Sequence, residues 1–166
     1  AKPEEIEAYL RTRPDKPFLS CEYAHAMGNS LGNLQLYTAL EERYEQYQGG
    51  FIWDFIDQEL RCREADGTER LCGGDDFARP TDGRFCSNGL LFADRTPSPK
   101  LAEAKFLYSP IRIRCARDGV EIENKRNFLD TSDLQFAWSL LRNGETFRSG
   151  SFAALLLPGE KKSFPL

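Results

Sequence analysis

The sequence has little histidine or methionine and no closely spaced cysteine pair. Its 166 residues include one His and one Met, and the five cysteines never form a Cys-x-x-Cys motif. A zinc knuckle or a disulfide framework needs paired cysteines at short spacing. We therefore expect free thiols in a reducing cytoplasm, and a metal site built from Cys62, Cys72 and Cys86 is the alternative.

An excess of positive charge and a long apolar run are also missing. The formal net charge is −4, which argues against a general nucleic-acid or anionic-membrane binder. No apolar run approaches the roughly 20 residues of a membrane span, and the first residues lack a signal-peptide pattern. We expect a cytoplasmic protein with no nucleic-acid or membrane partner, and a segment upstream of Ala1 stays open.

The first hundred residues mix helical and strand signals. Residues 1–13 predict a short polar helix, and residues 18–22 predict a buried strand. A helix with apolar residues three and four apart is predicted from residue 30 to 47, ended by Gly49-Gly50. Residues 51–56 then form an almost wholly apolar strand. Strand, helix and strand in this order indicate a βαβ unit with a parallel sheet.

The following segment, residues 57–100, has no clear periodicity but contains aromatic and apolar residues. So long a stretch predicts an ordered functional loop, and a short helix over 101–107 follows it. After Pro110 the pattern changes to short alternating strands, with hairpin signals at Asp118-Gly119 and Asn143-Gly144. The expected strands are residues 111–115, 120–124, 134–141 and 146–152.

These two patterns predict two parts of different fold class. Residues 1–108 are predicted to be α/β, and residues 109–166 all-β, an antiparallel sandwich. One βαβ unit cannot bury both faces of a parallel sheet, and four strands leave a sandwich with open edges. We therefore interpret the chain as a window cut across a domain boundary.

Three residues near the ends of the two predicted parallel strands are candidates for chemistry. Side chains at the C-terminal ends of such strands face the substrate site. Glu22 there is a nucleophile, base or electrostatic partner, or else a surface Glu in a loop or a partner for an Arg. His25 can bind a sugar hydroxyl or hold Glu22, or be a structural hydrogen bonder. Trp53 offers an apolar face for a pyranose, or is a core residue.

Further oxygen-bearing residues follow. Asp54 and Asp57 are candidate acids, or they pair with Arg61 or cap turns. Residues 73–76 and 85–89 offer oxygen ligands to an alkali or alkaline-earth ion, or are plain turns.

Three segments carry a family resemblance: Cys-Glu-Tyr-Ala-His-Ala-Met-Gly-Asn (21–29), Gly-Gly-Phe-Ile-Trp-Asp-Phe-Ile-Asp-Gln (49–58) and Phe-Cys-Ser-Asn-Gly-Leu-Leu-Phe-Ala-Asp-Arg-Thr-Pro (85–97). In their order and spacing they resemble the LacZ-type β-galactosidases of glycoside hydrolase family 2. The resemblance runs along the whole chain. It implies that residues 1–108 are the last part of a (β/α)₈ TIM barrel, with strands seven and eight at 18–22 and 51–56. It also implies that residues 109–166 begin an immunoglobulin-like β-sandwich.

The resemblance also implies residue roles. These are Glu22 as catalytic nucleophile, His25 as a sugar-site residue, Trp53 as the floor under galactose, and Phe85 (backbone oxygen) with Asn88 as part of a sodium site. Ser87 departs from some relatives, which carry a larger residue there.

A retaining mechanism on a terminal β-galactoside needs a second carboxyl group. The resemblance places that acid/base Glu, the Mg²⁺ ligands and the sodium site's aspartate upstream of this chain. We therefore expect the isolated chain to be inactive, and its partners to be the rest of the barrel, the preceding domains and further copies in a homo-oligomer.

Three alternatives stay open from the sequence. The first is a non-catalytic carbohydrate-binding or assembly module that uses Trp53 as a sugar platform. The second is a family 2 glycosidase that acts on a glucuronide or mannoside. The third is a structural metal protein.

Overall fold

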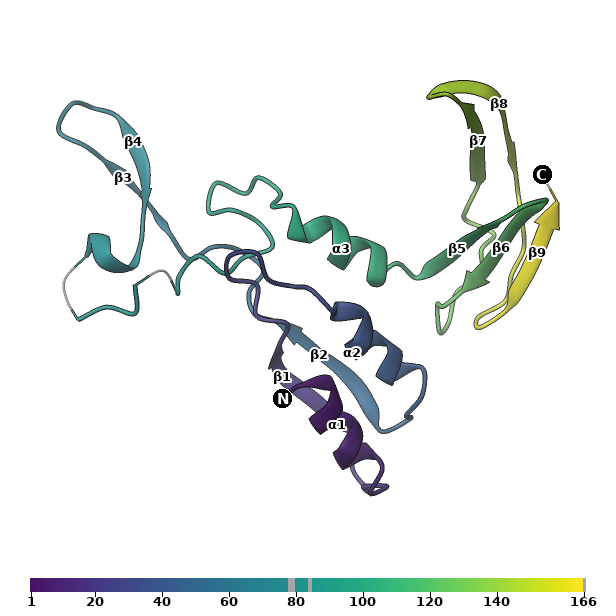
Figure 1. Cartoon of the computed structure of the whole chain (residues 1–166), viewed down its shortest axis with the longest axis horizontal. Coiled ribbons are helices and arrows are strands. Elements are labelled where there is room, and N and C mark those ends of the chain that lie inside the picture. The colour runs from purple at the N-terminus through teal and green to yellow at the C-terminus, as the bar shows by residue number, and fades with distance from the viewer. Residues whose placement is uncertain (78–79, 84, 166) are drawn as a thin grey trace. The chain divides into compact units, whose positions relative to one another are not determined.

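The computed structural model describes residues 1–77, 80–83 and 85–165 (Figure 1). The chain divides into two units, Ala1–Tyr108 and Ser109–Leu166. Each unit is described by itself below. Within the described ranges, no helix is long and apolar enough to cross a membrane.

The first unit is built on a parallel strand pair. Its first elements are α1 (Pro3–Leu10), β1 (Phe18–Tyr23), α2 (Leu34–Glu41) and β2 (Tyr47–Ile52). β1 and β2 pair in parallel, with Phe18 opposite Tyr47 and Tyr23 opposite Ile52. The predicted strand–helix–strand order and its parallel pairing are therefore confirmed (Figure 1).

The predicted boundary between α2 and β2 is wrong. The helix ends at Glu41, and β2 begins at Tyr47 and contains Gly49 and Gly50. A Cβ added to Gly50 would lie 2.7 Å from the Cβ of Ser20 and 2.9 Å from its carbonyl oxygen. Gly50 therefore allows the close approach of β2 to β1 and does not stop a helix.

Two apolar clusters hold this unit together. Ile6 and Leu10 of α1 pack with Leu40 and Tyr47. A second cluster joins residues of β1, α2, the helix α3 that ends this unit, and the loops between them: Tyr23, Ala26, Leu31, Leu34, Leu90 and Ala104. The end of β1 is therefore anchored in a core, which fixes where its last side chains lie.

The segment predicted to be one long loop contains regular structure. Its elements are β3 (Leu60–Arg63), β4 (Glu69–Cys72) and the 3₁₀ turn η1 (Gly74–Asp76). The helix predicted after it is confirmed as α3 (Lys100–Leu107). β3 and β4 form an antiparallel hairpin, visible as the teal ribbon in Figure 1. Its two strands have only four residues each, and Arg and Glu make up half of them, so the apolar pattern is too short to mark a strand.

This hairpin overturns the expectation of five free thiols. Cys62 and Cys72 form a disulfide, with their Cα atoms 6.0 Å apart, while Cys21, Cys86 and Cys115 are free. The antiparallel register brings the two cysteines within bonding range although they are ten positions apart in the sequence. Their pairing also removes two of the three thiolates that the cysteine metal site required.

Thiol titration of the denatured chain tests this pairing. Without reductant we expect three reactive thiols, and after reduction five, because two are held in the Cys62–Cys72 bond. A Cys62→Ser variant should gain one free thiol, on Cys72. Five reactive thiols before reduction would contradict the disulfide.

The second unit contains two small antiparallel sheets. Its strands are β5 (Ile111–Ala116), β6 (Gly119–Asn124), β7 (Phe136–Arg142), β8 (Glu145–Phe152) and β9 (Lys161–Pro165). One sheet has the order β5-β6-β9, and β7 pairs with β8. Both predicted hairpins are confirmed, and β9 is an additional strand that the sequence pattern did not indicate. The buried core consists of Val120, Ile122, Phe136, Ala154 and Leu156.

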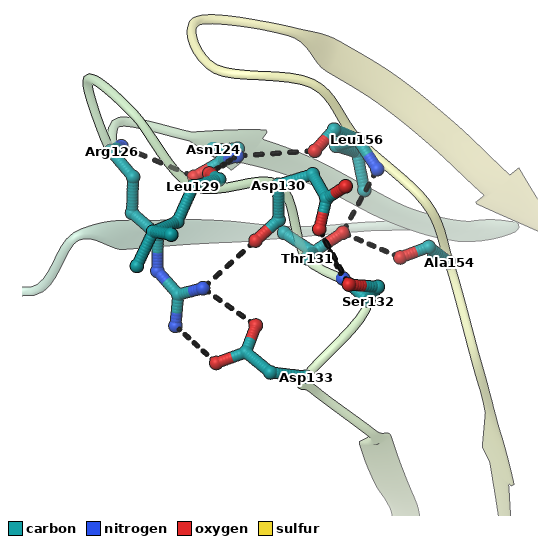
Figure 2. Close-up of polar contacts among 9 residues, drawn as sticks. All are labelled: Asn124, Arg126, Leu129, Asp130, Thr131, Ser132, Asp133, Ala154 and Leu156. Carbon is teal, nitrogen blue, oxygen red and sulfur yellow. Dashed lines mark hydrogen bonds and ion pairs between the residues drawn. The ribbon is translucent and has the colours of Figure 1, made fainter.

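A buried polar network links the end of β6 to the segment before β9 (Figure 2). Thr131 Oγ1 donates to Ala154 O (2.6 Å) and accepts from Leu156 N (2.9 Å). Asn124 Nδ2 donates to Leu129 O (2.9 Å) and Leu156 O (3.1 Å). Asn124 and Thr131 are fully buried, so these bonds satisfy groups that would otherwise be costly to bury.

Candidate functional site

The site begins where β1 and β2 end. Backbone pairing continues beyond the strands, since Trp53 N donates to Tyr23 O (3.2 Å) and Ala26 N donates to Trp53 O (2.7 Å). These bonds hold the turn after β1 against the residue after β2. The side chains that follow the two strands are therefore neighbours at one edge of the sheet.

Three predicted site residues share one hollow at this edge. Glu22, His25 and Trp53 line a hollow of about 440 Å³ together with Tyr37 and the first residues of the chain. Trp53 is 36% exposed, so it is not the core residue of the alternative interpretation. A carboxylate, an imidazole and an exposed indole around one hollow can contact a polyhydroxylated ring.

The end of β1 is held by a tyrosine that the sequence reading did not single out. Tyr23 is 5% exposed, and its hydroxyl contacts that of Tyr108. Its ring packs edge-on against the ring of Tyr37, with the ring centroids 5.0 Å apart. Burial, with the Tyr108 hydrogen bond, raises the pKa of Tyr23 far above its ordinary value, so it stays a neutral phenol. Because Tyr23 follows Glu22, these contacts fix the backbone that carries the candidate nucleophile.

Asp54 and Asp57 make structural hydrogen bonds, as in the alternative to a role as acids that the sequence left open. Asp54 accepts from Phe55 N (2.5 Å) and Gln58 Nε2 (2.9 Å). Asp57 accepts from Gly89 N (2.6 Å). Neither lines the hollow beside Glu22, where Glu5 supplies the other carboxylate among the described residues.

The predicted cation ligands lie on a loop near His25. The rings of Phe85 and His25 are 6.1 Å apart between centroids. Asn88 is 1% exposed, and its Nδ2 donates to Phe85 O (2.5 Å). In the described part of the chain, its buried Oδ1 has no hydrogen-bond partner.

The orphaned oxygen makes this loop suitable for a hard cation. Exchanging Nδ2 and Oδ1 by rotation of the amide would place two oxygens, Phe85 O and Asn88 Oδ1, beside each other. Two adjacent oxygens repel without a cation and are typical ligands with one. The residues present therefore fit part of an alkali-ion site.

A larger hollow, of about 730 Å³, lies along the same loop. Its lining includes Met27, Asp57, Glu59, Cys86, Ser87 and Lys100. Lys100 Nζ donates to Ala26 O (2.5 Å) and so ties α3 to the turn after β1. The sequence did not predict this contact of Lys100, because its partner is a backbone oxygen 74 residues away.

Comparison with known proteins defines the class of this chain. Residues 1–113 match the family model for the TIM barrel domain of glycosyl hydrolases family 2, and residues 120–166 match the model for domain 4 of β-galactosidase. The chain belongs to glycosyl hydrolase family 2. The resemblance predicted from its three sequence segments is thereby confirmed.

Among the curated relatives of this chain are several β-galactosidases. The chain is 48% identical to the β-galactosidase of Halalkalibacterium halodurans, over 99% of the chain and 16% of that protein. It is 51% identical to the β-galactosidase of Lactobacillus delbrueckii subsp. bulgaricus, over 97% of the chain and 16% of that protein. For that of Clostridium acetobutylicum, the identity is 45% over 100% of the chain and 19% of that protein. The chain thus spans less than a fifth of these relatives.

Proposed function

We propose that this chain is the end of the catalytic barrel and the start of the next domain of a retaining β-galactosidase. The observation that carries the proposal is the convergence of Glu22, His25 and Trp53 on one hollow at the carboxyl ends of two parallel strands. The names of the relatives support galactosides as substrates.

The fold of the intact protein follows from this proposal. β1 and β2 would be strands seven and eight of a (β/α)₈ barrel, and the second unit would begin an immunoglobulin-like sandwich. The upstream barrel and the preceding domains would be intramolecular partners, and the intact protein would be a cytoplasmic homo-oligomer.

In the proposed reaction, Glu22 attacks the anomeric carbon of a β-galactoside. The new bond joins a Glu22 carboxylate oxygen to that carbon, and the glycosidic C–O bond breaks. An acid about 5 Å away protonates the leaving oxygen and then, as base, activates the water that releases galactose. That acid/base Glu would lie upstream, outside this chain, so the isolated chain would not turn over substrate.

The other site residues would bind and orient the sugar. Trp53 would present its ring to the C–H face of galactose, and His25 would hydrogen-bond a hydroxyl. Phe85 O and Asn88 Oδ1 would hold a sodium ion, which when bound supplies a fixed positive charge for sugar oxygens. The Mg²⁺ proposed for the intact enzyme would take its ligands from the upstream barrel.

The test uses a completed enzyme, in which this chain replaces the matching segment of the H. halodurans β-galactosidase. We expect hydrolysis of an aryl β-galactoside, little hydrolysis of the matched glucuronide or mannoside, and β-galactose as the first product by NMR. The 166-residue chain alone should release no aglycone. First formation of α-galactose, or equal rates on another sugar, would contradict the proposal.

Trp53→Ala in the completed enzyme tests the sugar platform. We expect kcat/KM to fall at least about tenfold, because a tenfold change corresponds to about 1.4 kcal/mol and a stacked ring supplies about that much. Trp53→Phe keeps an apolar ring and should lose less. Wild-type kinetics for Trp53→Ala would remove Trp53 from the site.

A further inference from the structure

The loop that carries Asn88 is bonded to the segment after β2 along its length. Asp54 N donates to Asn88 O (2.8 Å), and Leu90 N donates back to Asp54 O (3.0 Å). Gln58 N donates to Cys86 O (2.7 Å). The backbone on both sides of Asn88 is therefore held to the residues that follow Trp53.

Two carboxylates add side-chain contacts to the residues on either side of Asn88. Asp57 Oδ1 accepts from Gly89 N (2.6 Å), and Glu59 Oε1 accepts from Ser87 Oγ (2.6 Å). Hydrogen bonds to a carboxylate are stronger than those between neutral groups. Glu59 and Ser87 are half-buried, so water screens their bond less than it would a surface pair.

Asn88 lies between these two anchors with an unused oxygen. Its side chain is buried, and within the described residues Oδ1 accepts no hydrogen bond. A buried amide oxygen without a partner is costly unless something binds it. The neighbouring anchors fix the backbone from which that amide projects.

We propose that the Glu59–Ser87 hydrogen bond is a positioning contact that fixes the backbone at Asn88, so that its amide, rotated to place Oδ1 beside Phe85 O, binds a sodium ion. Glu59 and Ser87 do not touch the ion or the sugar; they act through the backbone of residues 87–88. This inference rests on the proposed function, because it takes the sodium site at Phe85 and Asn88 as given.

The test measures the sodium concentration that half-saturates the completed enzyme. The readout is the rise in melting temperature as sodium is added. Choline chloride replaces sodium chloride so that the ionic strength stays constant. Ser87→Ala and Glu59→Ala should each raise that concentration roughly tenfold, which corresponds to about 1.4 kcal/mol, because each removes a hydrogen bond to a charged group. The double variant should be no worse than either single one, because both remove the same bond. Glu59→Gln keeps an acceptor oxygen but loses the charge, so it should raise the sodium concentration by less than Glu59→Ala does.

Glu69→Gln is the matched control, since Glu69 pairs with Arg61 and Arg63 on the exposed hairpin. It should leave the sodium midpoint unchanged. The sodium dependence of KM for an aryl galactoside should shift in parallel, and high sodium should restore the activity of Ser87→Ala. If Ser87→Ala does not fold, Glu59→Ala removes the same bond from its other end.

A lower melting temperature with an unchanged sodium midpoint would overturn the inference and leave only a structural role. A sodium response in wild type that neither variant alters would also overturn it, while the proposed function would stand. If the wild-type completed enzyme hydrolyses galactosides without any sodium response, the sodium site itself fails and the inference fails with it.

Discussion

Glu22→Gln in the completed enzyme should lower kcat for an aryl β-galactoside by at least about a thousandfold. Glutamine preserves the size of the side chain but is far too weak a nucleophile to attack the anomeric carbon. Because Tyr23 and the strand pairing hold the backbone at this point, we expect the variant to fold normally. Initial rates at saturating substrate, with magnesium and sodium present, measure the effect.

Glu45→Gln is the control for Glu22→Gln, because Glu45 is exposed and lies before β2, away from the hollow. It should keep wild-type kcat. Azide then separates a nucleophile from a positioning residue: with Glu22→Ala, azide should attack the sugar in place of the missing carboxylate and yield α-galactosyl azide. Glu22→Gln activity within tenfold of wild type would assign the attack to another carboxylate.

Thr131→Val should destabilise the second unit by about 3 kcal/mol. The substitution keeps the shape of the side chain but leaves Ala154 O and Leu156 N, both buried, without their partner. Each unsatisfied buried group costs about 1–3 kcal/mol. Urea unfolding followed by Trp138 fluorescence, in a Trp53→Phe background, reports on this unit alone, since the sequence has two Trp.

Thr146→Val is the matched control, since Thr146 is exposed on β8. It should change the free energy of unfolding by less than about 0.5 kcal/mol. If Thr131→Val is as stable as Thr146→Val, the network in Figure 2 does not contribute to stability.

The parts of the fold that sequence reasoning found have local signals. Asp118-Gly119 and Asn143-Gly144 marked both hairpins, and an apolar run marked β1. The run at residues 51–56 indicated a second strand but misplaced it, since β2 spans Tyr47–Ile52. The β3–β4 hairpin was missed because its strands have only four residues each, half of them charged, which is too short for an apolar pattern to be recognised. Its disulfide was missed for the same reason, since only the hairpin register brings Cys62 near Cys72.

The candidate site shows a similar division. Glu22, His25 and Trp53 could be named because they lie at or just after the ends of apolar runs, and parallel strands end at one edge. The contacts that hold the site could not be named, because they join residues far apart along the chain. Tyr23 meets Tyr108 across 85 residues, and Glu59 meets Ser87 across 28; neither pair has a pattern that marks it before the chain is folded.

The most direct test of the account is to trap the covalent intermediate. A 2-deoxy-2-fluoro-β-galactosyl fluoride slows release of the sugar, so the completed enzyme should accumulate one galactosyl adduct. Peptide mapping by mass spectrometry should place this adduct on Glu22, in the peptide that also contains His25. An adduct on another carboxylate, or none in an enzyme that still hydrolyses galactosides, would contradict Glu22 as the nucleophile.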